Sequence, residues 1–316
     1  MSRKKVFFSG LTFVIIYFAV LKFVFPGYVK PFVPHHSDIL DYAYDWKTLN
    51  YSLDSRPVGL ILTYLFGLIG ERYSIVLSSL VCVFGSTLLI ARIVCYETKS
   101  ELKLWNLGIY FVLLLAAPSF YINYSFDIYT TYSLFIGLSA LKISYNEKCL
   151  ERNRVGRIIV CFCLYLACFL CKETYILSFI YFHFCKVLKQ IKKKKEMNNQ
   201  IYYLIVCSVS ACIALLYGKL SGSAFISANS TDITSPYYTC LSPESVIHTF
   251  AYYFCGLNNI FVILFLLFIV LYYRSEAGVY EVANLAIAGI LAYLPYSVLP
   301  NKVVPHYIFV SYPFLL

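Results

Sequence analysis

The chain has 316 residues, of which 60% are hydrophobic and only 13% are charged, and its mean hydropathy is +0.71. Soluble domains have a much lower apolar content, so this composition excludes an ordinary soluble protein and predicts a polytopic membrane protein. The net charge of +10 comes from basic residues concentrated in a few short loops. Membrane orientation requires such loops, so the charge is not evidence for a nucleic-acid partner.

Apolar runs of bilayer-spanning length recur along the whole sequence. The predicted spans are 6–25, 73–95, 104–121, 128–145, 157–171, 174–188, 201–218, 258–273, 280–299 and a last run from 306 to the end. They predict a single all-α transmembrane domain over residues 1–316, with about 9–10 transmembrane helices. Basic residues at 3–5 precede the first run and no small-residue cleavage site follows, so we expect a retained helix with a cytoplasmic N-terminus. The last run stops at Leu316, which predicts a truncated or reduced C-terminal region.

The charge pattern predicts the topology. The run 57–70 is short for a span and predicts an interfacial or re-entrant helix. The positive-inside rule requires two basic segments to face the cytoplasm, namely the loop 142–157 and the run Lys192–Lys195. Both do so only if two conditions hold. Segment 57–70 must not cross, and the stretch 157–188 must break into two short helices at Cys171–Thr174. The non-cytoplasmic face then carries residues 26–72, 122–127, 172–173, 219–257 and 300–306.

The first outer loop, 26–72, is acidic. It carries Asp38, Asp41, Asp45 and Asp54 together with two histidines and Arg56. Charged groups held at a membrane face usually belong to a site, because keeping charge beside hydrocarbon is expensive. A carboxylate there can take a proton from an attacking hydroxyl, and an arginine can hold a phosphate.

The sequence contains no Walker A loop, no dinucleotide-binding glycine motif and no kinase motif. An enzyme acting at the outer face therefore needs a donor carried by lipid. Five segments together resemble the GT-C superfamily of integral-membrane glycosyltransferases, and the pattern is closest to the bacterial O-antigen glucosyltransferases that modify lipopolysaccharide. These segments are Ser37–Asp41, Arg56-Pro57, Pro118–Tyr132 with Asp127 at the start of a helix, the Lys172-Glu173 tip, and the Pro300–Tyr307 loop.

The resemblance implies transfer of a sugar from a polyprenyl-phosphate donor to a glycan or lipid-linked acceptor at the non-cytoplasmic face of a bacterial inner membrane. In a eukaryote, the endoplasmic-reticulum membrane is the alternative. Asp38 or Asp41 would be the catalytic base, with Asp38 preferred. Their Asp-x-x-Asp spacing differs from the adjacent pair of the family, which leaves the choice between them open.

The resemblance also assigns the groups that would bind the donor phosphate or support the site. The phosphate-binding residues would be Arg56, Lys172, Lys302 and His306, with Asp127 and Glu173 in supporting roles. Many relatives carry an arginine in the late loop, where this chain has Lys302 and His306. The spacing of the histidines and cysteines gives no support for a metal site, and no cofactor is expected. We expect Arg56, Lys172 and Lys302 to border one cavity at the outer face.

Two other classes of polytopic protein share this composition. An O-antigen or capsule polymerase or flippase remains the alternative, although such proteins are expected to have arginine-rich outer loops and the first outer loop here is acidic. A transporter is disfavoured, because the sequence shows no clear internal repeat and few charges in the middle of its spans.

Overall fold

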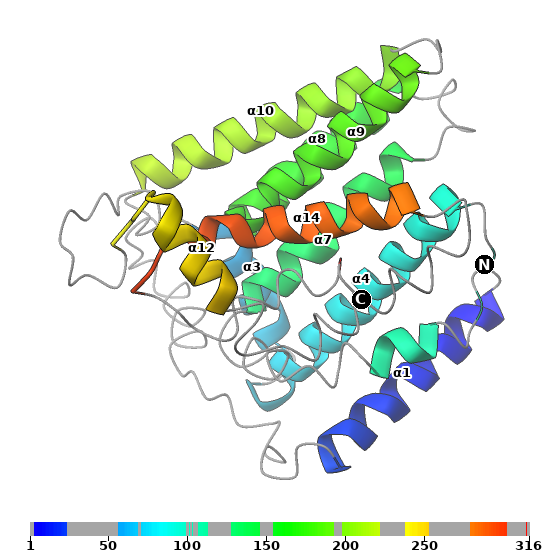
Figure 1. Ribbon diagram of the computed structural model, residues 1–316. Helices are drawn as coiled ribbons and strands as arrows, with labels where there is room; N and C mark the ends of the chain where they lie inside the picture. The colour runs from blue at the N-terminus through cyan, green and yellow to red at the C-terminus, as the bar shows by residue number, and fades with distance from the viewer. Residues whose placement is uncertain are drawn as a thin grey trace.

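In the computed structural model, the described residues are 3–23, 56–68, 71–98, 101, 103, 107–112, 128–145, 154–192, 198–221, 238–252, 279–301 and 314. Their regular structure is helical, with no β-strand among them, as the sequence predicts (Figure 1). The elements are α1 (Arg3–Phe23), α3 (Pro57–Gly67), α4 (Glu71–Thr98), α7 (Ile128–Ser144), α8 (Arg154–Cys171), η3 (Glu173–Tyr175), α9 (Ile176–Lys192), α10 (Asn198–Leu220), α12 (Pro243–Ala251) and α14 (Val279–Ser297).

Two of these helical segments, Arg154–Cys171 and Gln200–Leu220, are long and apolar enough to cross a membrane, judged by length and composition. Shorter apolar helical stretches occur at Val6–Ala19, Val81–Tyr96 and Ala283–Ser297. Helix α3 has 11 residues and is about 16 Å long, roughly half the thickness of a bilayer core. It is therefore too short to span a membrane, as predicted for this segment.

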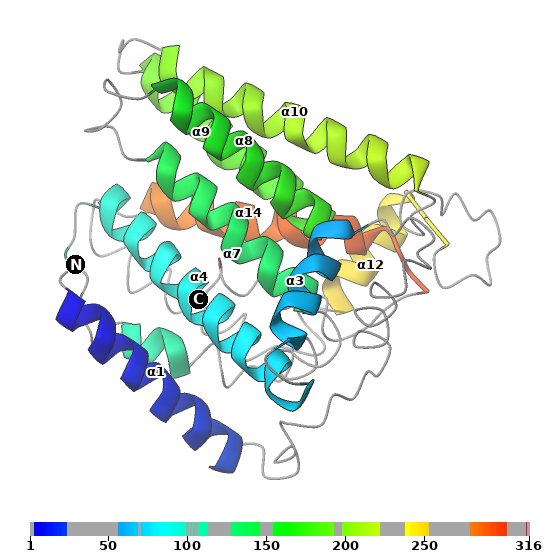
Figure 2. The same ribbon diagram turned by 180° about the vertical axis from the view of Figure 1, so that it is seen from behind.

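The helices pack in a series that follows the chain only in part (Figures 1 and 2). Helix α1 packs against α4, α4 against α7, and α7 against α8. Beyond α8, helix α10 contacts both α8 and α9, and α14 covers α9. The core between them is rich in buried aromatic rings, including Phe13 against Phe111 with ring centroids 4.8 Å apart. Such rings supply much of the apolar area that holds helices together.

Helices α8 and α9 fold back on each other as a hairpin. The rings of Tyr165 and Phe179 lie 5.7 Å apart, whereas 14 positions of continuous helix would separate them by about 21 Å. The hydroxyl of Tyr165 also lies 2.7 Å from Nε2 of His183, deep in the core. This geometry confirms the predicted break at Cys171–Thr174.

The bundle has two chemically different ends. At the end that we call the basic end, the amine of Lys142 lies 5.7 Å from the ring of Tyr96 and the guanidinium of Arg154 lies 4.5 Å from the ring of Tyr202. The amine of Lys186 also lies over a tyrosine ring there. Tyrosine rings attract cations through their negative faces. The opposite end, which we call the hairpin end, carries the α8–α9 tip, the C-terminal end of α14 and helix α12 (Figure 1).

One segment differs from its predicted structure. The charge pattern predicts one outer loop over 219–257, but Pro243–Ala251 form helix α12. The Ser242 hydroxyl accepts a hydrogen bond from the Ser245 amide at 3.2 Å and caps the helix, and Pro243 occupies its first turn. Serine followed by proline is a strong helix-start signal, so α12 could have been predicted.

Candidate functional site

The tip of the α8–α9 hairpin forms hydrogen bonds to neighbouring helices on both sides of the break. Helix α8 ends at Cys171, and Lys172 takes an extended conformation with φ −164° and ψ 130°. The backbone carbonyl of Lys172 is therefore available to Ser133 of α7, whose hydroxyl donates to it at 3.0 Å. On the other side, the hydroxyls of Thr174 and Tyr296 lie 2.8 Å apart. These contacts tie the tip to α7 and α14.

An ion pair joins the tip to the start of α3. Arg56 Nη2 lies 3.0 Å from Glu173 Oε1, and Arg56 Nε donates to Glu173 Oε2 at 3.4 Å. Two parallel N–H···O contacts of this kind give a guanidinium–carboxylate pair a defined geometry. The Arg56 side chain is 28% exposed and the Glu173 side chain is 15% exposed, so the pair lies at the boundary between the core and the surface.

The environment of Glu173 favours its charged form. Burial of the carboxyl opposes ionisation, but the Arg56 guanidinium and the hydrogen bonds that it donates outweigh burial, with a smaller contribution from Lys172. The pKa of Glu173 therefore lies below its ordinary value. The carboxylate is ionised at neutral pH and holds the guanidinium in place.

Lys172 provides a second cation beside the pair. Its side chain is only 4% exposed, and its amine lies 5.8 Å from the ring of Tyr296. A lysine is almost never buried this deeply unless it is paired. The hairpin end thus holds two cations and one carboxylate: Lys172 and Glu173 at the break, and Arg56 at the start of α3. Such a group can bind an anion of higher charge than a carboxylate, for example a phosphate.

The structure brings together three of the residues predicted for the site. Arg56 and Lys172 lie at the same end of the bundle, and Glu173 connects them through its ion pair with Arg56. Arg56 and Glu173 are 117 positions apart in the chain. The other predicted site residues lie outside the described residues and stay predictions; they are Asp38, Asp41, Asp127, Lys302 and His306. Within the described residues, no group of three or more metal-ligating side chains occurs.

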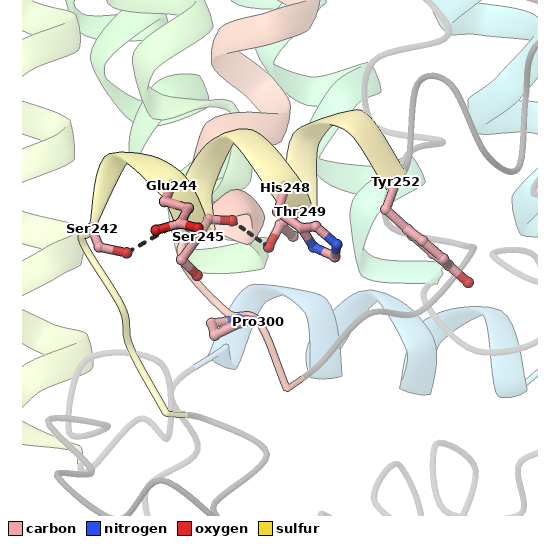
Figure 3. Close-up of a pocket in the computed structure, with 7 residues that line it drawn as sticks. All are labelled: Ser242, Glu244, Ser245, His248, Thr249, Tyr252 and Pro300. Atoms are coloured by element: carbon pink, nitrogen blue, oxygen red, sulfur yellow. Dashed lines mark hydrogen bonds between the residues drawn. The ribbon is translucent and has the colours of Figure 1, made fainter.

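A hollow of about 570 Å³ lies along α12, close to the end of α14 (Figure 3). Its described lining comes from Ser242, Glu244, Ser245, His248, Thr249, Tyr252 and Pro300. The side chains of Glu244, His248 and Tyr252 follow one another at intervals of four residues, so they lie on one face of the helix. None of these residues was predicted to belong to a site. The capping serine and proline could have revealed the helix, but nothing in the sequence indicates that α12 would lie beside Pro300.

Comparisons with protein-family models, with curated proteins and with solved structures find no match to this chain.

Proposed function

We propose that this chain is an integral-membrane glycosyltransferase that moves a sugar from a polyprenyl-phosphate donor to a glycan or lipid-linked acceptor at the non-cytoplasmic face of a bacterial inner membrane. The observation that carries the proposal is the group of Arg56, Glu173 and buried Lys172 at the hairpin end. Transfer from a polyprenyl phosphate needs cations where the phosphate departs, because negative charge develops there in the transition state. Preorganised cations at a partly buried site meet that need.

The distribution of charge supports the proposed orientation. Lys142, Arg154 and Lys186 gather at the basic end, which is the cytoplasmic face under the positive-inside rule. Arg56 and Glu173 form an ion pair, so both lie at the same face of the membrane. The chain must therefore cross the membrane an even number of times between them. The four spans predicted between them satisfy the requirement if α3 does not cross. These spans are 73–95, 104–121, 128–145 and 157–171.

In the proposed reaction, the acceptor hydroxyl attacks the anomeric carbon of the donor sugar and the polyprenyl phosphate leaves. Asp38 or Asp41 takes the proton of the hydroxyl as general base. Arg56 and Lys172 stabilise the departing phosphate, with Lys302 and His306 as further donors from the late loop. Glu173 orients the Arg56 guanidinium through the two contacts described above and so keeps it in place between turnovers.

The proposal is tested by direct transfer. The purified protein is placed in phospholipid vesicles with radiolabelled polyprenyl-phosphate glucose, galactose or mannose and a glycolipid extract of the source membrane. We expect label to move to the glycolipid fraction. Lys172→Met and Arg56→Ala should each reduce the rate by about 100-fold, as expected for loss of one preorganised group that stabilises developing charge.

Lys186→Met is the matched control, because it removes a lysine that lies beside a tyrosine ring at the opposite end of the bundle. It should keep the wild-type rate. Surface glycans of cells with and without the gene provide the second readout, and we expect one sugar to be missing without it. Failure to transfer any of the three sugars, together with unchanged glycans, would overturn the proposal. Shortened glycan chains would favour the polymerase alternative.

A further inference from the structure

We infer that the hollow along α12 binds a neutral carbohydrate, and that it holds the acceptor for the transfer reaction. The second part rests on the proposed function, whereas the first rests on the chemistry of the hollow alone. A volume of about 570 Å³ falls in the range of small-molecule sites, about 300–1,000 Å³.

The polar groups of the hollow suit hydroxyl groups. The Glu244 carboxylate accepts hydrogen bonds, and the His248 imidazole can donate with one nitrogen and accept with the other. Within the described part of the chain, neither side chain makes a hydrogen bond to another protein group. The Ser242 and Thr249 hydroxyls are already used in the helix, by the Ser245 amide and the Ser245 carbonyl. The Ser245 hydroxyl is engaged with the Cys240 thiol, so Glu244 and His248 are the polar side chains here that have no partner among the described residues and can face a ligand.

Tyr252 adds an apolar surface with a polar tip. Its side chain is 44% exposed, and it lies at the same side of α12 as His248 (Figure 3). A half-exposed tyrosine ring can cover the apolar C–H face of a sugar while its hydroxyl stays in water. Carbohydrates present this combination of apolar faces and hydroxyl edges.

Charge distinguishes this hollow from the phosphate site. The described residues that line it include one carboxylate and no lysine or arginine, so a phosphate would meet repulsion there. Among the described residues, the cations of the proposed phosphate site are Arg56 and Lys172. A neutral acceptor in the hollow and a donor phosphate at the hairpin tip would each meet complementary chemistry.

The end of α14 links the two places. Tyr296 contacts Thr174 through the hydroxyl pair at 2.8 Å, and Pro300 lines the hollow only four positions later. Helix α12 is held against the same helix by Phe250 and Tyr293, with ring centroids 5.7 Å apart. In addition, the Cys240 amide donates to the Val298 carbonyl at 2.9 Å. The hollow, which would hold the acceptor, is thus connected through the end of α14 to the hairpin tip, which would hold the donor phosphate.

The test uses the full chain in lipid nanodiscs and saturation-transfer NMR. The probes are the methyl glycosides of glucose, galactose, mannose, rhamnose and N-acetylglucosamine. We expect at least one glycoside to bind, and Tyr252→Ala to weaken that binding about tenfold. His248→Ala and Glu244→Gln should weaken it several-fold. Tyr252→Phe keeps the ring and should bind nearly as wild type.

Ile247→Ala is the matched control, because Ile247 is on the same helix, is 66% exposed and does not line the hollow. Its binding should equal that of wild type, and hydrogen exchange of the α12 amides should show that each variant keeps the helix. The inference is overturned if no glycoside binds, or if Tyr252→Ala and His248→Ala bind as wild type does. It is also overturned if the hollow binds tetramethylammonium, an organic cation, in place of the glycosides.

The outcomes for the two proposals are distinguishable. Binding of a glycoside that depends on Tyr252, without any sugar transfer, would overturn the proposed function and leave the carbohydrate site standing. Sugar transfer with an unchanged acceptor KM in Tyr252→Ala would overturn the acceptor site and leave the glycosyltransferase standing.

Discussion

The ion pair between Arg56 and Glu173 has a measurable pH dependence. The pKa of Glu173 is lower in the folded chain than its ordinary value of 4.5, so between these two values the unfolded state binds more protons than the folded state. The pair therefore stabilises the fold above about pH 4.5, and this contribution is lost as the pH falls through the folded pKa. Glu173→Gln should remove it at neutral pH.

We expect Glu173→Gln to cost about 1–2 kcal/mol at pH 7, between the values for exposed and buried pairs, because Arg56 is partly exposed. The difference from wild type should shrink below pH 4.5. Thermal unfolding in detergent between pH 3 and pH 7 measures both effects. The exchanged pair Arg56→Glu with Glu173→Arg should recover part of the loss. A difference that is constant with pH would contradict the assigned pairing.

The thiol of Cys240 allows a test of the hydrogen bonds at the start of α12. Hydrogen bonds from Ser242, and a weaker one from Ser245, stabilise the thiolate and lower the pKa of Cys240 below its ordinary value. The Cys240 Sγ and Ser242 Oγ atoms are 3.4 Å apart. Ser242→Ala should therefore move the pH profile of Cys240 alkylation by iodoacetamide to higher pH, as followed by peptide mass spectrometry. Ser139→Ala in α7 should leave the profile unchanged.

At this scale, the sequence identifies residue types more readily than partners. Arg56, Lys172 and Glu173 could be selected because charged residues between apolar runs are unusual. Arg56 pairs in the structure with Glu173, a carboxylate 117 positions away along the chain. Contacts between residues this far apart depend on how the helices pack, which local patterns do not encode. The same applies to Tyr296, one of many tyrosines in the sequence. It contacts Thr174 because α14 packs beside the hairpin.

At the scale of the helices, close packing depends on small residues. A Cβ atom at Gly137 of α7 would collide with the ring of Phe179 and would lie 2.9 Å from Cys168 Sγ. Gly137→Ala should therefore destabilise the contact of α7 with the α8–α9 hairpin by about 1–3 kcal/mol. Thermal unfolding of the purified protein measures this loss.

Gly108→Ala is the natural control. Among the described residues, apart from its own helix and chain neighbours, no atom lies within 4 Å of a Cβ atom at that position. Alanine has the higher helix propensity, so this variant should be neutral or more stable by up to about 1 kcal/mol. Equal losses at the two glycines would contradict the packing described for α7.

The helices themselves were partly predictable. Long apolar runs predicted α1, α4, α7, α10 and α14, and the positions of basic residues predicted the break between α8 and α9. Helix α12 was missed because its nine residues are partly polar and lie within a long loop. A search for apolar runs does not detect such a helix, although its capping serine and its proline were present in the sequence.

For the whole molecule, the separation of charge between the two ends predicts which single cysteines can be labelled from outside the cell. Under the proposed orientation, Cys240 lies outside and a cysteine introduced by Glu101→Cys lies in the cytoplasm. In a background with the other cysteines replaced, a membrane-impermeant maleimide added to intact cells should label Cys240 only. Labelling of the cysteine at position 101 after permeabilisation is the positive control. Labelling of both from outside would contradict the proposed topology.

The pairing of Arg56 with Glu173 also has a consequence for biosynthesis. The two residues are 117 positions apart, and ribosomes add about 5–20 residues each second. The arginine is therefore made about 6–23 s before its carboxylate exists. During that interval α3 cannot reach its final attachment, so translation sets part of the order of assembly. Helices α4, α7 and α8 must be made before the pair can form, and α10, α12 and α14 follow it.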